Sequence, residues 1–346
     1  MPARARIAEE IAAAGGWIPF ARYMQLALHE PGIGYYASGA RKFGPAGDFV
    51  TAPELGSLFG RTLARQLHGF ERIVEIGAGS GALADVLTRE LECDYWVLET
   101  SAELRSRQHE RLGSRVRHID RLPERLRGAV IANEVVDAMP VHVVRWTERG
   151  IMERGVNADF TWSDRPAAGN LLAAAEHIAV PNPYVSEIGL LARAWMRTLA
   201  PSLERGAIFV IDYGFPAREY YHAQRSSGTL MCHHRHRAHA DPFARPGEED
   251  ITAHVDFSAL AEAARAGGLE VLGFTSQAQF LVNCGITEVL GEANVANALH
   301  YAPIAAEAQK LLSPAEMGEL FKVLAVGTPD RAGLIGFKDG DRSASL

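Results

Sequence analysis

Residues 74–87 read VEIGAGSGALADVL, and this stretch decides the fold class. A strand-like run leads into three glycines at alternate positions, Gly77, Gly79 and Gly81, and a helix-like run follows them. Glycines let the backbone turn sharply and approach a ligand without a Cβ in the way, and the free N–H groups of the following helix point at that ligand. The spacing predicts a loop that holds an adenine cofactor, either a dinucleotide or S-adenosylmethionine.

Strands and helices alternate around this loop. Alternation of this kind predicts an α/β fold with a mostly parallel, doubly wound sheet. A capping box at Thr100 and Glu103 predicts the start of one of the helices. From the apolar patterns we expect strands at 72–77, 95–99, 116–119, 129–134, 207–214 and 269–276, and helices at 80–91, 186–199 and 256–268.

Other segments read as additions to this core. Residues 4–30 have a helical pattern, and a glycine-rich stretch follows whose aromatic residues argue against disorder, so we expect residues 33–56 to form a lid. Residues 141–162 read as a β-meander, 215–255 as irregular, and the chain from 277 to about 325 as mostly helical. The predicted organisation is an N-terminal helical and lid region, 1–66, and a core, 67–346, with insertions at about 141–185 and 215–255.

Composition narrows the class of protein. The net charge of −7 over 346 residues argues against a general nucleic-acid binder, because phosphate binding needs a basic face. Three scattered cysteines without a C-x-x-C suit a reducing compartment. We see no apolar run long enough to span a membrane and no signal peptide, and Glu9 and Glu10 are unlike a transit peptide. We therefore expect a cytoplasmic protein.

The glycine pattern alone leaves the cofactor open. Gly77-x-Gly79-x-x-Ala82 satisfies the dinucleotide fingerprint, and Glu99 lies about twenty residues on, where a ribose-binding acid belongs. An ordinary strand–helix turn is the alternative without a ligand. Glu75 stands two residues before the first glycine, and a buried carboxylate is costly unless it is paired or hydrogen-bonded. The pattern E-x-G-x-G-x-G resembles the first motif of class I methyltransferases, and this resemblance favours S-adenosylmethionine.

A second group of polar residues follows the fourth predicted strand. The segment NEVVDAMP, 133–140, contains Asn133, Glu134 and Asp137. Polar groups at the carboxyl ends of parallel strands face the ligand crevice, so we expect these three there. The alternative is a helix start capped by Asn133. Asp212 and Tyr213, after a later strand, are expected in the same crevice.

With these motifs in hand, the chain resembles the MidA-like family of class I S-adenosylmethionine-dependent methyltransferases. The likeness rests on GDFVTAPE, EIGAGSGAL, NEVVDAMPVH, VIDYG and DITAHVDF, and it runs over most of the chain. Ala78 and Ser80 stand where the family commonly has proline and arginine, but neither change removes a glycine. The resemblance implies a Rossmann-like core, S-adenosyl-L-methionine as cofactor and methyl transfer to a protein. Mitochondrial members assist respiratory complex I assembly and methylate arginine on a complex I subunit, so a complex I subunit is one candidate partner.

The site residues follow from the motifs and this likeness. A carboxylate can hold the fork of a guanidinium and leave its near nitrogen to attack. This chemistry makes Glu134 the first catalytic candidate, followed by Asp137 and Glu54. The expected cofactor contacts are Glu75, Gly77, Gly79, Gly81, Glu99, Asn133, Asp48 and Thr51.

Two further interpretations remain. The cluster CHHRHRAH offers His233, His234, His236 and His239, yet two arginines lie among them, so we expect a substrate-contact loop and no metal. His254 and Asp256 are weaker site candidates, and Asp256 alternatively caps a helix. The competing functions are an NAD(P)-dependent oxidoreductase and a non-catalytic assembly factor that keeps the cofactor fold.

Overall fold

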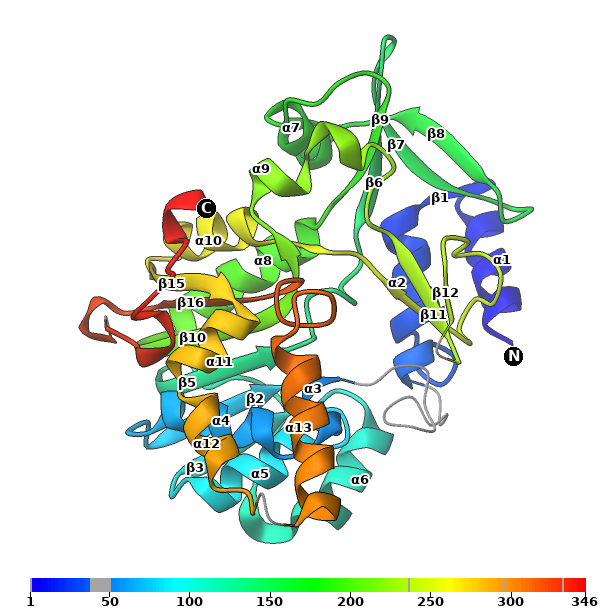
Figure 1. Cartoon of the computed structure of the whole chain (residues 1–346). Helices are drawn as coiled ribbons and strands as arrows, with labels where there is room; N and C mark the ends of the chain where they lie inside the picture. The colour runs from blue at the N-terminus through cyan, green and yellow to red at the C-terminus, as the bar shows by residue number, and fades with distance from the viewer. Residues whose placement is uncertain (1, 38–50, 236, 295–296, 332) are drawn as a thin grey trace. The chain divides into compact units, whose positions relative to one another are not determined.

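The computed structural model describes residues 2–37, 51–235, 237–294, 297–331 and 333–346 (Figure 1). The chain divides into two compact units, the first made of residues 1–49, 136–195 and 215–256 and the second of 50–135, 196–214 and 257–346. The predicted domain boundary at residue 66 does not coincide with the limits of these units. Helix α4 (Leu58–Leu67) belongs to the second unit, because its Leu63 and Leu67 are fully buried in that unit's core.

The second unit contains the predicted α/β core. Its elements are α3 (Ala52–Leu55), α4, β2 (Arg72–Ile76), α5 (Ala82–Glu90), β3 (Asp94–Leu98), α6 (Ala102–Leu112), β4 (Arg117–Ile119), β5 (Leu126–Asn133), β10 (Leu203–Phe215), α10 (Phe257–Ala266), β15 (Glu270–Ser276), α11 (Gln277–Asn283), α12 (Ile286–Gly291), α13 (Ala298–Leu312) and β16 (Phe321–Gly327).

These strands form one sheet in the order β15-β16-β10-β5-β2-β3-β4. Neighbours from β10 to β4 are parallel, and β16 runs antiparallel to both β10 and β15. From β2, the chain builds outward to β3 and β4 on one side and to β5 and β10 on the other. The prediction of a mostly parallel, doubly wound sheet is confirmed.

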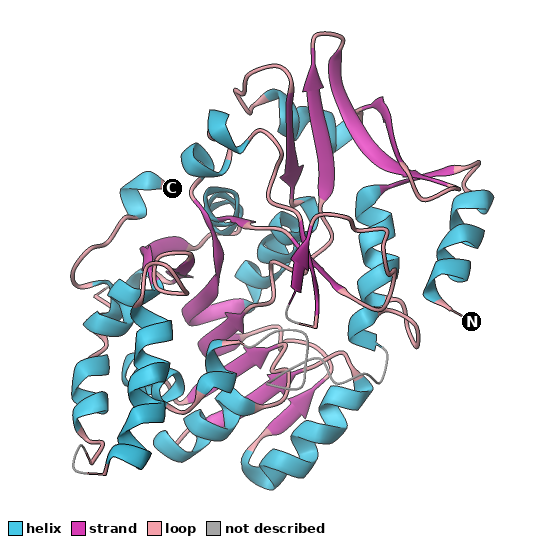
Figure 2. Ribbon diagram, turned by 45° about the vertical axis from the view of Figure 1, so that its right-hand side comes forward, coloured by secondary structure: helices cyan, strands magenta, loops and turns pink. Residues whose placement is uncertain are grey.

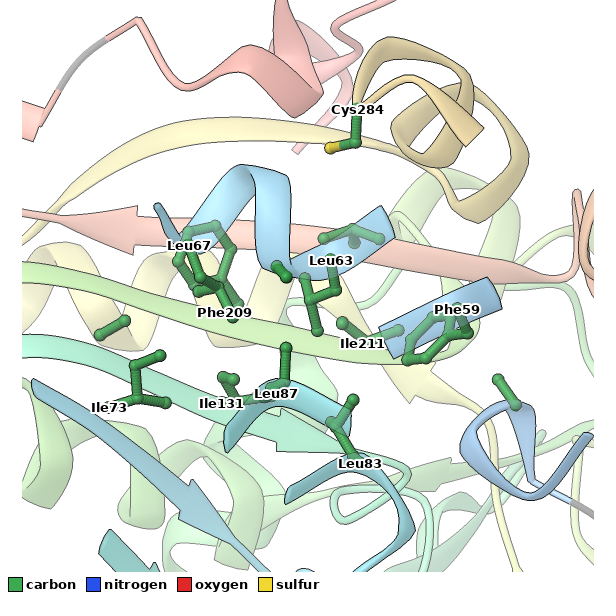
Figure 3. Packing of buried hydrophobic residues seen from close by; sticks show 14 of the residues in the cluster. Phe59, Leu63, Leu67, Ile73, Leu83, Leu87, Ile131, Phe209, Ile211 and Cys284 are labelled. Atoms are coloured by element: carbon green, nitrogen blue, oxygen red, sulfur yellow. The ribbon is translucent and has the colours of Figure 1, made fainter. Parts of the chain in front are cut away.

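Buried apolar side chains pack one face of this sheet against helices (Figure 3). Ile73 on β2, Ile131 on β5 and Phe209 on β10 contribute from the sheet, and Leu63 on α4 and Leu87 on α5 come from the helices. Removal of these side chains from water is the main term that stabilises such a core. The core therefore fixes the strand ends that carry the candidate site.

Strand β16 corrects the expectation that the chain is mostly helical up to about residue 325. Its sequence FKVLAVG is buried at every position, and it lies between β10 and β15. A short, continuous apolar run does not distinguish a buried strand from a buried helix. Only the pairing with β10 and β15 determines that this segment is a strand.

The first unit contains the predicted additions. Its elements are α1 (Ala3–Ala13), β1 (Trp17–Pro19), α2 (Phe20–His29), β6 (His142–Thr147), β7 (Gly150–Asn157), β8 (Trp162–Pro166), α7 (Gly169–Glu176), β9 (Tyr184–Ile188), the first part of α8 (Leu190–Leu199), α9 (Ala217–Tyr220), β11 (Met231–His234), β12 (Arg237–His239), β13 (Asp250–Thr252) and β14 (Val255–Asp256). The β-meander is confirmed as β6, β7 and β8, and the long paired strands stand at the top of Figure 2.

Three local expectations in the chain were wrong. The helix expected at 186–199 starts only at Leu190, because residues 184–188 form β9 and pair with β6. The stretch 215–255 is not wholly irregular, since β11 pairs with both β12 and β13. Helix α6 is capped by Ser101, whose hydroxyl accepts from the N–H of Leu104, and not by Thr100. In the first two cases, strand pairing overrides the local pattern.

Among the described residues, no helix combines the length and the apolar character that crossing a bilayer requires.

Candidate active site

The site lies in the second unit, at the carboxyl ends of β2 and β5. These two strands are neighbours, and the chain builds outward from them in opposite directions. In open α/β sheets, ligands bind in the crevice outside the strand ends at this reversal. The glycine loop follows β2, and Asn133 is the last residue of β5, so the two predicted motifs meet at this point.

The glycine loop adopts a backbone that ordinary residues avoid. Gly77, Gly79 and Gly81 have φ angles of 66°, 54° and 79°. A Cβ added to Gly77 would lie 3.1 Å from Cγ2 of Val135, and one added to Gly81 would lie 3.1 Å from Cδ1 of Leu112. The loop therefore needs glycine for its turn as well as for space.

Glu75 lies beneath the loop and is 3% exposed. The hydroxyl of Tyr95 on β3 donates to its Oε2 at 2.7 Å. Burial raises the pKa of Glu75 to about 7, the charge of Glu99 adds to the rise, and the Tyr95 hydrogen bond opposes it. A contact between Glu75 and the cofactor remains a prediction.

Glu99 follows β3 and is held on both carboxylate oxygens. Oε1 accepts from the backbone N–H of Ser101 at 2.9 Å, and Oε2 accepts from Nε2 of Gln108 at 3.2 Å. Burial raises the pKa of Glu99, and these two hydrogen bonds oppose the rise. Gln108 also donates to the carbonyl of Gly79 at 2.8 Å, so one side chain connects the glycine loop to Glu99.

Sequence reasoning did not identify Gln108 as a residue of the site. It is completely buried on α6, on the same helix face as the buried Leu104 and Leu112. A polar residue at an apolar position of a helix must find hydrogen-bond partners inside the protein. A glutamine on the apolar face of this helix was the sequence signal that could have identified Gln108.

Asn133 and Glu134 stand at the end of β5. Glu134 has a φ of 52°, a left-handed conformation that is uncommon for a residue other than glycine and often marks functional sites. Its Oε1 accepts from Nδ2 of Asn133 at 3.2 Å and from the backbone N–H of Ala52 at 3.2 Å. Oδ1 of Asn133 is buried and has no hydrogen-bond partner in the part of the chain that the structure describes.

The segment around Glu54 lies against the glycine loop. Glu54, on α3, accepts a hydrogen bond from the hydroxyl of Ser80 in the loop. Nη1 of Arg111 donates to the same hydroxyl at 3.1 Å. Thr51 is buried immediately before α3. The structure therefore brings Thr51 and Glu54 to the site region from a distant part of the sequence.

Asp212 and Tyr213 lie near the carboxyl end of β10, just beyond its pairing with β5. Ile211 pairs with Asn133, which places the two following residues at the same edge of the sheet as the loop. Asp212 is completely buried, and its Oδ1 accepts from the backbone N–H of Tyr213 at 2.9 Å.

Other predicted residues are not brought to this site within the second unit. Asp137, His254 and Asp256 belong to the first unit, and Asp48 lies outside the described residues, as does most of the expected lid. Asp256 accepts from the hydroxyl of Tyr221 at 3.3 Å and lies 3.7 Å from Nη2 of Arg193.

The structure describes only part of the predicted histidine cluster. His236 lies outside the described residues, and His239 is close to Cys232 and Glu249, with the possible ligand atoms of the three within 4.8 Å of one another. Nε2 of His239 lies 3.0 Å from Oε2 of Glu249, and Nδ1 accepts from the N–H of Asp241 at 3.3 Å. A proton on Nε2 would let that nitrogen donate to Glu249 while Nδ1 accepts from Asp241.

The strand order, the glycine loop after β2 and the acid after β3 define an α/β core of the class I methyltransferase type. The family described as "Putative S-adenosyl-L-methionine-dependent methyltransferase" matches residues 58–275, and the chain belongs to it. The dinucleotide interpretation of the glycine loop is therefore set aside, and S-adenosyl-L-methionine is the cofactor of the family.

Individual relatives agree with this placement. A superfamily member from Burkholderia thailandensis, solved with S-adenosyl-homocysteine bound, is 49% identical and has a TM-score of 0.96, with 99% of this chain and 96% of that chain covered. The Protein arginine methyltransferase NDUFAF7 homolog, mitochondrial, of Drosophila melanogaster is 28% identical over 90% of this chain and 82% of its own length. Protein arginine methyltransferase NDUFAF7, mitochondrial, of Danio rerio is also 28% identical, over 90% and 84%.

Proposed function

We propose that this methyltransferase acts on a protein, with the guanidinium of an arginine as the methyl acceptor. The relatives named protein arginine methyltransferases support the substrate class, and they match nine-tenths of the chain. The observation that carries the proposal is Glu134, a carboxylate held in a left-handed backbone conformation at the reversal point of the sheet. A complex I subunit as the target is an expectation from the family resemblance.

The residues at the strand ends fit S-adenosyl-L-methionine. The loop of Gly77, Gly79 and Gly81 offers close approach to backbone N–H groups at the start of α5. Glu99 would accept from the hydroxyls of the cofactor ribose, as acids at this position do in related sheets. The buried Oδ1 of Asn133 supplies an acceptor for an N–H or O–H group of the cofactor.

When bound, the cofactor supplies an electrophilic methyl group on a sulfonium. Glu134 would accept from the guanidinium N–H groups, keep its positive charge on the far nitrogens and leave the near nitrogen free to attack. The guanidinium, whose pKa exceeds about 12, must lose a proton during the reaction. We assign Glu134 as the group that would receive this proton.

The test uses cofactor that carries an isotopically labelled methyl group. We would incubate the purified protein with an extract of cells that lack it, and identify labelled peptides by mass spectrometry. Labelled methyl-arginine that disappears with Glu134→Gln is the expected result. Label on lysine, on a small molecule or on nothing would overturn the proposed acceptor.

A further inference from the structure

Gln108 connects three groups at the cofactor site. Its Nε2 lies 2.8 Å from the carbonyl oxygen of Gly79 and 3.2 Å from Oε2 of Glu99, and its Oε1 lies 2.9 Å from Nε2 of His118. The side chain is completely buried. Every polar atom of this amide therefore faces a partner.

The chemistry of these partners fixes the orientation of the amide. A carbonyl and a carboxylate accept hydrogen bonds, and together they need the two protons of an NH₂ group. Oε1 then points at His118, whose Nε2 must carry a proton in order to donate. Reversal of the amide would place an oxygen against two acceptors, so the Gly79 carbonyl and Glu99 select this orientation, and His118 holds Oε1 in it.

We propose that Gln108 is a positioning residue that holds the glycine loop and Glu99 in the arrangement that binds the cofactor. Its hydrogen bond holds the loop at Gly79, the central glycine, and orients the carboxylate that would meet the ribose. Ser101 holds the other oxygen of the same carboxylate, so Glu99 is restrained from two sides. This inference rests on the proposed placement of the cofactor.

The first test replaces the amide without changing its size. Gln108→Met keeps the length and the apolar packing and removes all three hydrogen bonds. We expect at least a tenfold loss of affinity for S-adenosylhomocysteine in calorimetry. Gln66→Met is the matched control, because Gln66 is a buried glutamine of the same unit that accepts from the N–H of Gly336 at 2.8 Å, away from the loop. We expect it to lower the melting temperature and to leave the affinity unchanged.

A double-mutant cycle separates positioning from general destabilisation. If Gln108 acts through Glu99, then Gln108→Met combined with Glu99→Gln loses little more affinity than the worse single variant. Losses that multiply would overturn the inference, as would equal affinities of Gln108→Met and the wild type or equal losses for Gln108→Met and Gln66→Met.

His118→Ala provides the test if Gln108→Met does not fold. His118 is only half-buried, and its removal takes away the donor that holds Oε1 of Gln108. We expect a several-fold loss of affinity, and an unchanged value would contradict the inference. A wild-type protein that binds no S-adenosylhomocysteine would instead refute the proposed cofactor site.

Discussion

At the scale of single residues, Glu134 has two roles that its contacts allow. Its Oε1 accepts from the backbone N–H of Ala52 and from the amide of Asn133, as a structural acceptor would. Its position at the end of β5 and its left-handed backbone suit a group that also meets a ligand. The charge distinguishes the two roles, since an acceptor to neutral donors does not need one.

Glu134→Gln removes this charge and keeps an acceptor oxygen for Ala52 and Asn133. We expect methyl transfer to fall at least 100-fold, which corresponds to the roughly 3 kcal/mol that a charge-assisted hydrogen bond supplies. Cofactor affinity and melting temperature should stay close to those of the wild type. Turnover is measured with a substrate found by the labelling experiment described above. Near-normal turnover would exclude Glu134 and direct attention to Asp137 and Glu54.

Glu75 predicts a pH dependence of stability. Burial raises its pKa to about 7 in the folded protein, against 4.5 as its ordinary value. The folded state thus binds the proton more tightly, and stability is lost as the pH rises from about 4.5 to 7. Glu75→Gln keeps an acceptor for Tyr95 and removes this titration. Urea unfolding of the free protein measures the free energy of unfolding at each pH. Relative to the wild type, this free energy should increase for the variant by up to about 3 kcal/mol between pH 4.5 and 8. A constant difference across this range would contradict the assignment.

At the scale of elements, the glycine loop between β2 and α5 combines a turn with a ligand surface. Gly79 and Gly113 both have positive φ, 54° and 57°, and nothing lies within 4 Å of a Cβ added to Gly113. A side chain at either position is strained, and Gly113, with a ψ of −133°, lies outside the left-handed helical region. The two glycines therefore form a pair in which only the first should matter for the cofactor.

Gly79→Ala should abolish detectable binding of S-adenosylhomocysteine in calorimetry, because the added methyl group stands where the backbone must approach the ligand. Gly113→Ala should lower the melting temperature and bind S-adenosylhomocysteine normally. Circular dichroism of both variants checks that the fold is native. Equal binding by the two variants would place the cofactor elsewhere.

At the scale of the whole molecule, a cofactor that binds only the folded chain stabilises it. At a concentration of one hundred times Kd, the gain is about 2.7 kcal/mol. For a protein larger than 250 residues, this corresponds to a rise of several degrees in melting temperature. S-adenosylhomocysteine should produce this rise, and the same concentration of NAD should not. A rise with NAD alone would return the protein to the oxidoreductase class.

The core could be predicted from the sequence because the patterns that mark it involve residues close together in the chain. The strand at 72–77, the three glycines and the helix after them lie within twenty residues, and each follows from steric or periodic rules. Glu99 was found because strand, loop and acid occur at a regular spacing. Gln108 was missed because its role depends on Gly79, which lies 29 residues away in the sequence and meets it only in the folded unit.

The sequence by itself determined the fold class, the glycine loop and the family to which the chain belongs. Tertiary structure alone decided that FKVLAVG is the strand β16 between β10 and β15, that residues 184–188 pair with β6, and that Glu54 lies beside Ser80. The physical reason is the range of the interactions. Glycine conformation and helical periodicity are properties of neighbouring residues, whereas strand pairing and buried hydrogen bonds depend on partners that only the folded chain brings together.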